Sequence, residues 1–426
     1  MSSISTTTYN KTVLNNGLRI VTEKIPGVRS ISIGIWINVG SRDETKMENG
    51  ISHFIEHMLF KGTRERSAKE IAFSLESLGG GLNAFTSKEE TCYHALVLDE
   101  HLDQAVDVLS DILINSTLSP TNIGREKSVV VEEIREIDET PADHIHELFS
   151  QNFWRGQPLG WPIMGAAENV RSFNRNTLKC FMKKNYCARR TVVTGAGNIS
   201  HRKLVNLIKV KFHIPPGTER PAANMQIPVG FSSEFHRNGS KQTHLCIGFP
   251  GVRYGSRLRI PLLVLHNYLG GGMSSVLFQK IREEKGMAYT VFTFPDFYRD
   301  CGVFGAYLAI DKKHLHEAVE IMLKEFRKLK EDKFSRSKLD KIKEQFRGSL
   351  ILGMESTSGR MNRLGRQEIL TGTYLSLQDS IKLVNSVTSN DIIEVARRIF
   401  DPSSITITSL GSARKGDLNK VNWSLL

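Results

Sequence analysis

The sequence has no long apolar run and few cysteines, and these two absences exclude whole classes of protein. Among its 426 residues, apolar runs such as Ile260–Leu265 fall far short of the ~18 residues that a membrane-spanning helix needs. The five cysteines are scattered, odd in number and contain no C-x-x-C pair. We therefore expect no membrane partner, no disulfide framework and a reducing compartment.

The N-terminus lacks the features of a targeting peptide. Residues Met1 to Asn10 are rich in serine and threonine, but they contain neither a basic region nor an apolar core. A strand pattern begins at about Thr12, which leaves little room for a leader. We expect a cytoplasmic protein of the bacterial type, with a mature mitochondrial matrix form as the alternative.

Positive charge is in excess, but it is not arranged for nucleic acid. The formal net charge is +12, and most of the excess lies in the second half of the chain. The densest basic stretch, Lys324 to Arg347, alternates with acids such as Glu325 and Glu331 at helical spacing. This pattern is typical of a solvated helix face, and no nucleic-acid-binding motif accompanies it. We expect no nucleic-acid partner.

Composition and local patterns predict a globular protein of mixed secondary structure. Hydrophobic residues make up 40% and charged residues 24%, so the chain can bury sizeable cores, and its length suggests roughly two to four domains. Asn15-Asn16-Gly17 separates two short strand patterns as a hairpin turn does. Residues Ile31 to Val39 alternate with period two, which predicts a strand with one buried face. Asn49 is placed to cap a helix that runs to about Lys61.

The second half of the chain repeats the first at an offset of about 213 residues. Asp99 to Leu109 matches Lys312 to Met322, and Ile31-x-Ile33-Gly34 matches Leu245-x-Ile247-Gly248. A proline-rich stretch, His213 to Pro221, lies at the midpoint. We infer a duplication and predict domains at residues 1–213 and 233–426, joined by a linker at 214–232.

One helix carries the residues for metal chemistry. His53 and His57 are four residues apart, so both imidazoles project from one helix face and can bind one ion. Glu56 is placed to reach a water in the open position of that ion. A catalytic zinc site needs a third protein ligand, and the helix around Val129 to Ile137 supplies candidates. They are Glu126, Glu132, Glu133 and Glu136.

The other histidines are not predicted to be ligands. His266 sits at the offset of His53, but the positions of Glu56 and His57 are taken by Leu269 and Gly270, so the second half has no metal site and His266 is expected to be a packed core residue. His144 and His146 are two residues apart and face different sides of a helix.

The string Gly-Ile-Ser-His-Phe-Ile-Glu-His-Met-Leu-Phe-Lys-Gly-Thr, residues 50–63, contains the inverted zincin signature H-x-x-E-H. It closely resembles pitrilysin-type zinc metallopeptidases, particularly the processing peptidases. The resemblance covers nearly the whole chain. It implies an α+β fold of two homologous halves, each a β-sheet packed with helices, that face each other as a clamshell around an extended peptide.

The same resemblance implies roles for individual residues. Glu133, 76 residues after His57, matches the distant zinc ligand of the family, and Glu126 matches its supporting acid. Residues 79–86 with Thr91 and Tyr93 resemble the substrate-binding strand, which predicts that Asn83 and Ala84 bind substrate. Arg282 and Tyr289 lie in a stretch similar to the second-domain signature that contacts bound peptide; Gly286 predicts a turn between them.

The sequence thus predicts a zinc endopeptidase with one Zn²⁺ per chain, bound by His53, His57 and Glu133, with Glu56 as the base. Asp143 and Glu147 are four residues apart and resemble the acids by which processing peptidases recognise an arginine near the cut. The expected partners are a peptide substrate and, by analogy with these relatives, a second copy of the chain in a homodimer. The alternatives are a non-catalytic scaffold paralogue of the same fold and, on charge alone, a basic nucleic-acid-binding protein.

Overall fold

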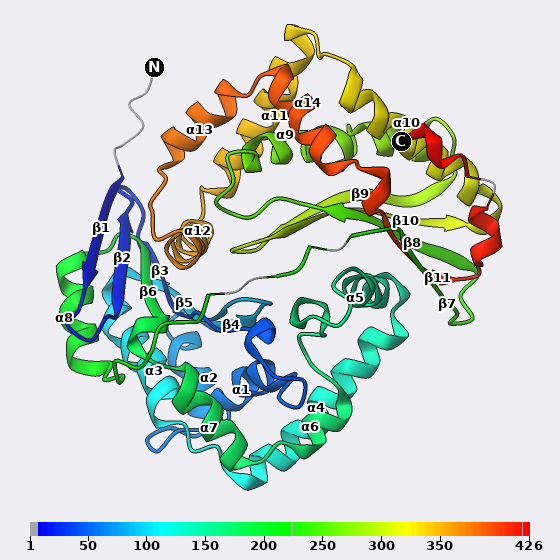
Figure 1. Ribbon diagram of the computed structural model, residues 1–426. Helices are drawn as coiled ribbons and strands as arrows, with labels where there is room; N and C mark the ends of the chain where they lie inside the picture. The colour runs from blue at the N-terminus through cyan, green and yellow to red at the C-terminus, as the bar shows by residue number, and fades with distance from the viewer. Residues whose placement is uncertain (1–6, 223–224, 228, 420) are drawn as a thin grey trace. The chain divides into compact units, whose positions relative to one another are not determined.

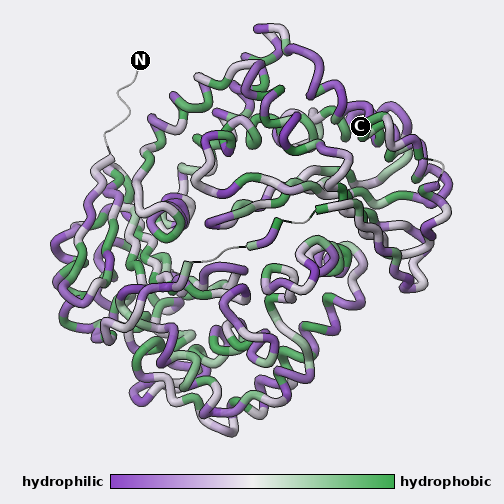
Figure 2. The backbone as a smooth tube through the Cα atoms, in the orientation of Figure 1, coloured by the Kyte–Doolittle hydropathy of each residue, from purple (hydrophilic) through white to green (hydrophobic). Residues whose placement is uncertain are grey.

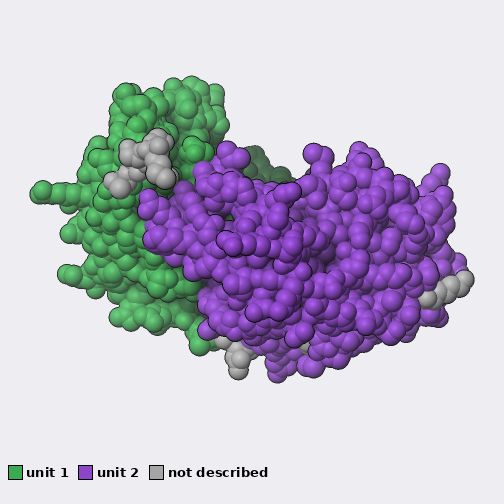
Figure 3. Space-filling view, turned by 90° about the horizontal axis from the view of Figure 1, so that it is seen from above, with its two compact units in different colours: residues 1–135, 161–222, 353–374 green, residues 136–160, 223–352, 375–426 purple. Residues whose placement is uncertain are grey.

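The computed structural model of the protein describes residues 7–222, 225–227, 229–419 and 421–426. Two predictions fall partly outside the described residues. One concerns the N-terminal stretch predicted to lack a targeting peptide, of which residues 1–6 are not described, and the other concerns the predicted linker, of which positions 223–224 and 228 are not described. The chain divides into two compact units (Figure 3), residues 1–135, 161–222 and 353–374, and residues 136–160, 223–352 and 375–426. No helix in the described part is long and apolar enough to span a membrane.

Within the described residues, the first unit contains a six-stranded sheet in the order β1-β2-β6-β3-β5-β4. All neighbouring strands are antiparallel except β2 and β6, which are parallel. The predicted hairpin at Asn15-Asn16-Gly17 joins the first two strands. The strands are β1 (Thr8–Val13), β2 (Arg19–Lys24), β3 (Ser30–Ile37), β4 (Gly81–Thr86), β5 (Thr91–Leu98) and β6 (Thr191–Gly197).

The second unit contains a five-stranded sheet that repeats this order as β7-β11-β8-β10-β9. Here too a single pair is parallel among the described strands, β7 with β11, at the place of β2 with β6. The strands are β7 (Ser232–His236), β8 (Gln242–Pro250), β9 (Ala288–Phe297), β10 (Gly302–Asp311) and β11 (Thr406–Gly411). The repeated order agrees with the duplication inferred from the sequence, and two homologous halves of sheet and helices confirm the predicted α+β class.

Helices cover both sheets (Figure 1), and apolar segments run along the strands (Figure 2). Those of the first unit are α1 (Ile51–Leu59), α2 (Ala68–Glu76), α3 (Leu102–Asn115), α4 (Pro120–Glu139, assigned to this unit up to Arg135), α6 (Ala167–Ser172), α7 (Arg175–Asn185), α8 (His201–Lys211) and α12 (Thr357–Leu370). Those of the second unit are α5 (Pro141–Phe153), α9 (Arg259–Gly270), α10 (Leu315–Glu331), α11 (Arg336–Gly353), α13 (Leu377–Ser386) and α14 (Ser389–Ile399).

The two halves of the chain exchange one helix each. Helix α5 comes from the first half but packs on β8 and β11 of the second sheet, whereas α12 comes from the second half and packs on β2, β3 and β6 of the first sheet. The boundaries at 213 and 233 stay a prediction for the two sequence repeats, and each compact unit contains segments from both halves of the chain.

The exchange corrects the prediction that the strand at Ile31 to Val39 has one buried face. The large residues Ile31 and Ile33 do pack in the main core of the first unit. However, Trp36 on the opposite face is also fully buried, in a cluster with Met361 of α12. The small residues between the isoleucines mark the surface on which a helix lies close to the sheet.

Two glycines at equivalent positions allow this close approach. A Cβ atom at Gly34 would lie 2.5 Å from the Sδ atom of Met361 on α12. A Cβ atom at Gly248 would lie 2.2 Å from the ring of Phe149 on α5. Both distances are far below van der Waals contact, so neither helix can pack as it does against a residue with a side chain.

We expect Gly248→Ala to lower the free energy of unfolding by about 1–3 kcal/mol, the usual cost of overpacking a core. A Phe149→Leu change in the same chain should restore part of this loss, because it removes the ring that the new methyl group meets. Gly348→Ala is the control: it lies within α11, where a Cβ atom meets nothing within 4 Å. Urea unfolding should show no loss of unfolding free energy for the control. Equal losses for both variants would mean that the contact with Phe149 does not cause the destabilisation.

Candidate metal centre

Helix α1 carries three of the predicted site residues, His53, Glu56 and His57. It begins at Ile51, and its N-cap residue is Gly50, so the prediction that Asn49 caps the helix is wrong. Asn49 instead donates from its side-chain amide to Glu44 and to the carbonyl of Pro162. The helix brings the two imidazole rings to 4.6 Å between centroids, as the spacing of four residues predicts.

Glu133 of α4 joins the two histidines. Its Oε2 atom lies 3.5 Å from Nε2 of His57 and 4.0 Å from Nε2 of His53. One potential ligand atom from each residue lies within 4.8 Å of the other two. Among the histidine, cysteine and acidic side chains of the described residues, this group is close enough together to hold a metal ion. The other acids proposed for this role, Glu132 and Glu136, are exposed to solvent.

The chemistry of the three side chains fits a divalent metal. Oε2 of Glu133 and Nδ1 of His53 are buried and have no hydrogen-bond partner, although buried polar atoms almost always have one. Burial, together with the charge of His57, lowers the pKa of His53 to about 4, so its imidazole is neutral near pH 7 and offers a lone pair. Two imidazole nitrogens and one carboxylate oxygen form a donor set that zinc takes in catalytic sites.

Glu126 supports the site from outside this group. Its Oε1 atom accepts a hydrogen bond of 2.9 Å from Nδ1 of His57, which leaves Nε2 of that ring free to bind a metal. Its Oε2 atom pairs with Lys61 at 2.9 Å. Burial raises the pKa of Glu126, but these two hydrogen bonds outweigh burial and the pKa lies below its usual value. Glu126 is thus a supporting acid.

Burial lowers the pKa of His57, but the hydrogen bond with Glu126 and the charges of Glu133, Glu126 and Glu56 outweigh it. The pKa of His57 therefore lies above its usual value. The surrounding carboxylates thus give the site a negative potential that favours any cation.

Glu56 is held in place by a hydroxyl group that sequence reasoning missed. Thr86, the last residue of β4, donates a hydrogen bond of 2.5 Å to Oε2 of Glu56. Burial raises the pKa of Glu56, and the bond from Thr86 partly opposes this. A carboxylate with a raised pKa and a fixed direction suits a general base. Thr86 ends the stretch that resembles the substrate-binding strand, but its bond to Glu56 could not be predicted because it depends on how β4 lies beside α1.

Strand β4 forms one edge of the first sheet and lies against α1. Asn83 is exposed on this strand and Ala84 is half-buried. No other described strand pairs with its outer edge. Thr91 and Tyr93 lie on the next strand, β5, and both are fully buried; Tyr93 bonds to Tyr186. These two residues therefore belong to the core beneath the edge.

Arg282 and Tyr289 lie together in the second unit. The guanidinium of Arg282 stacks 4.9 Å from the ring centre of Tyr289 and 4.7 Å from that of Phe278. Gly286, with φ of 61°, makes the predicted turn between them. Tyr289 is the second residue of β9, and 74% of its surface is exposed, so its ring is accessible to solvent.

The acids Asp143 and Glu147 lie on α5, also in the second unit. Asp143 is exposed in the first turn, after Pro141 at the first helical position, and Glu147 is half-buried four residues later. A nearby imidazole, His146, packs against Phe294 and Tyr307. The two acids therefore share one helix, as their spacing predicts.

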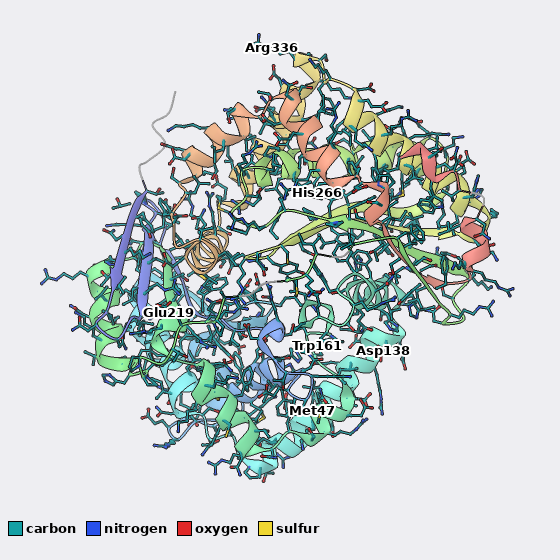
Figure 4. All side chains as sticks on the ribbon, in the orientation of Figure 1. Met47, Asp138, Trp161, Glu219, His266 and Arg336 are labelled. Carbon is teal, nitrogen blue, oxygen red and sulfur yellow. The ribbon has the colours of Figure 1, made fainter. Side chains whose placement is uncertain are left out.

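The remaining histidines take structural positions. His266, labelled in Figure 4, lies on α9 and its Nδ1 atom is 2.7 Å from the hydroxyl of Thr293. Burial lowers the pKa of His266 to about 4. His144 contacts the carbonyl of Asp138 through Nδ1. Neither histidine belongs to the group of His53, His57 and Glu133.

The chain matches two family models in succession. The model described as insulinase (peptidase family M16) covers residues 19–167, and the model described as peptidase M16 inactive domain covers residues 172–346. An uncharacterized zinc protease of Bacillus subtilis, YmxG, is 41% identical over 386 residues, which are 90% of this chain and 94% of that relative. The chain belongs to peptidase family M16. The resemblance to pitrilysin-type metallopeptidases is thereby confirmed.

Further relatives agree with this family. An uncharacterized zinc protease of Streptomyces coelicolor is 37% identical over 401 residues, 92% of this M16 chain and 87% of its own length. A protease from Helicobacter pylori has the same fold, with a TM-score of 0.89, 23% identity and coverage of 96% of this chain and 100% of its own. A chain of complex III2 from Candida albicans also has this fold, with a TM-score of 0.83, 19% identity and coverage of 96% and 99%.

We expect Glu133→Gln to weaken zinc binding strongly, because an amide is a poor ligand beside two imidazoles. Glu126→Gln should weaken it about 10- to 100-fold, the usual effect of removing a carboxylate that orients a ligating histidine. Glu132→Gln is the control on the same helix, since Glu132 is exposed and pairs with Arg135. Competition with a chromophoric chelator measures all three affinities. A Glu133→Gln protein that binds zinc like the control would assign the third ligand elsewhere.

Proposed function

We propose that this M16 chain is a zinc-dependent endopeptidase that cleaves peptides or presequence-like segments. One observation carries the proposal: His53, His57 and Glu133 converge on one point, and Glu56, on the same helix turn as His57, is fixed beside them by Thr86. The names of the relatives, zinc proteases, support the same reaction class. A chain that served only as a scaffold would need none of these four side chains.

The residues divide the work of peptide hydrolysis. His53, His57 and Glu133 would hold one zinc ion. When bound, zinc polarises the scissile carbonyl and lowers the pKa of its bound water. Glu56 takes a proton from the attacking water and delivers it to the leaving amine, a task that its raised pKa suits. Thr86 keeps that carboxylate turned in one direction.

The edge strand β4 supports the way in which a peptide is bound. An extended peptide that adds to this edge would pair through its main chain, in a manner largely independent of its sequence. The strand ends at Thr86, which touches the base, so a peptide on β4 runs beside Glu56. We propose that Asn83 and Ala84 provide these main-chain contacts, and that Arg282 and Tyr289 contact the peptide from the second unit.

The decisive test is Glu56→Gln. We expect this variant to bind zinc normally, because all three ligands remain, and to lose at least ~10²-fold in turnover of a quenched-fluorescent peptide. Glu48→Gln is the control: within the described part of the chain the Glu48 carboxylate accepts hydrogen bonds from Thr45 of its own turn, so this variant should leave turnover unchanged. A zinc-loaded Glu56→Gln protein with near-normal activity would remove Glu56 from this role. A wild-type protein that holds zinc but cleaves no peptide library would favour the scaffold alternative.

We further propose a preference for arginine near the cleavage point. Asp143 and Glu147, one turn apart on α5, can accept paired charge-assisted hydrogen bonds from a guanidinium. Their position on the helix supports this: Asp143 lies exposed in the first turn, and Glu147 follows one turn later.

Profiling with a peptide library should therefore show arginine enriched two residues before the scissile bond. Asp143→Asn combined with Glu147→Gln should weaken this preference by at least ~10-fold in kcat/KM, since charged hydrogen bonds contribute about 1.5–3 kcal/mol. Glu139→Gln, an exposed acid at the end of α4, is the control and should keep the preference. If the double variant selects arginine as the wild type does, these two acids are not the specificity site.

The expected partner is thus a peptide, and a homodimer remains our proposal for the assembly, testable by light scattering.

The basic stretch on α10 and α11 does not support nucleic-acid binding, because its charges pair with acids one turn away. Arg327 pairs with Glu331, and Lys328 pairs with Glu325. The bacterial origin of the relatives supports the cytoplasmic proposal over the mitochondrial one.

A further inference from the structure

The start of the metal-binding helix is held by a side chain that lies outside the metal site. Glu44 follows a short 3-10 turn, Ser41–Asp43, and reaches across to α1. Its Oε2 atom accepts hydrogen bonds from the backbone N–H of Gly50 at 2.8 Å and from the amide of Asn49 at 3.0 Å. Its Oε1 atom accepts from the backbone N–H of Ser52 at 2.8 Å. Ser52 directly precedes the ligand His53.

Helix α1 cannot be capped by its own N-cap residue. The first N–H groups of a helix have no partner within it, and a Ser, Thr, Asp or Asn side chain usually supplies one. Here the N-cap is Gly50, which has φ of 100° and no room for a side chain, since a Cβ atom would lie 2.4 Å from the carbonyl oxygen of Met164. The carboxylate of Glu44 takes over this function from six residues away.

The burial of Glu44 indicates that this contact matters. Its exposed fraction is 4%, and its partners are N–H groups of residues 49–52, with no lysine or arginine paired to it among the described residues. Burial raises the pKa of Glu44 to about 7, although the bonds from Ser52, Gly50 and Asn49 act in the opposite direction. Burying an acid without a cation is unfavourable unless hydrogen bonds compensate, and here all of them go to the start of α1.

The turn that carries Glu44 is itself fixed. Asp43 forms a bidentate ion pair with Arg220, whose side chain is 3% exposed. Arg42 pairs with Glu89 at 2.6 Å, and both side chains are buried. These pairs anchor residues 41–44 to the body of the first unit. Glu44 therefore lies on a fixed turn, and the hydrogen bonds of its carboxylate fix the first turn of α1 relative to that turn.

We propose that Glu44 is a positioning residue of the metal site: it sets the first turn of α1 so that His53 faces Glu133. The inference rests on the proposed zinc binding and deepens it. His53 depends on this support more than His57 does, because His57 has its own partner in Glu126, whereas Nδ1 of His53 has none.

The test compares Glu44→Gln with Glu70→Gln in the full-length protein. Glutamine keeps the size of Glu44, but its NH₂ group must face one of the backbone N–H groups that the carboxylate accepts from. Glu70 is the matched control, because its carboxylate caps α2 through the backbone N–H of Ser67 at 2.7 Å, and α2 carries no site residue. Zinc affinity is measured by chelator competition, and the absorption spectrum of the cobalt-substituted protein reports the ligand geometry.

We expect Glu44→Gln to weaken zinc binding about 10- to 100-fold and to change the cobalt spectrum, with both unchanged in Glu70→Gln. A role in stability alone would lower the melting temperature of both variants and move neither readout, and that result overturns the proposal. If Glu44→Gln does not fold, Asn49→Ala takes its place, because it removes one hydrogen-bond donor to Glu44. The proposal then requires Asn49→Ala to weaken zinc binding, and an unchanged zinc affinity in that variant overturns the proposal. A wild-type protein that binds no zinc refutes the proposed function as well, so the two failures are distinguishable.

Discussion

Each β-sheet of this protein packs one face against a helix from the other half of the chain. Gly34 and Gly248 make that close packing possible, against α12 and α5 respectively. The exchange begins close to the candidate site, because Glu133 lies on α4 and α4 leads directly into α5 through Thr140. The predicted third ligand therefore lies just before the point at which the chain passes from one compact unit to the other.

Within the first unit, each functional side chain on α1 has a different support. His57 is oriented by Glu126 from α4, Glu56 by Thr86 from β4, and the turn before His53 by Glu44. The three supports come from separate segments, so the geometry of one short helix depends on much of the unit. These contacts hold the predicted ligands and the proposed base in fixed directions, and fixed directions reduce reorganisation during a reaction.

The local spacing of residues was enough to predict the core of the site, and tertiary contacts explain what it missed. His53, Glu56 and His57 follow from helix periodicity, and the repeat at Gly34 and Gly248 follows from the duplicated sequence. Asn49 looks like an N-cap in sequence, but the cap depends on a carboxylate that reaches α1 through the fold. Thr86 is likewise invisible to periodicity, since its partner is 30 residues away. The second buried face of β3 was missed because the helix that covers it lies more than 300 residues later.

The helix exchange also bears on the origin of the chain. Two sheets with related strand orders, each packed against a helix from the other repeat, are what an exchange of one helix between two copies of a half would produce. A polypeptide with the first repeat alone would lack α12, the helix that packs over Trp36. In the full chain this helix is supplied from the same molecule, so its packing does not depend on protein concentration. The second repeat has Leu269 and Gly270 where the first has Glu56 and His57, so the two repeats share the packing but not the candidate metal centre.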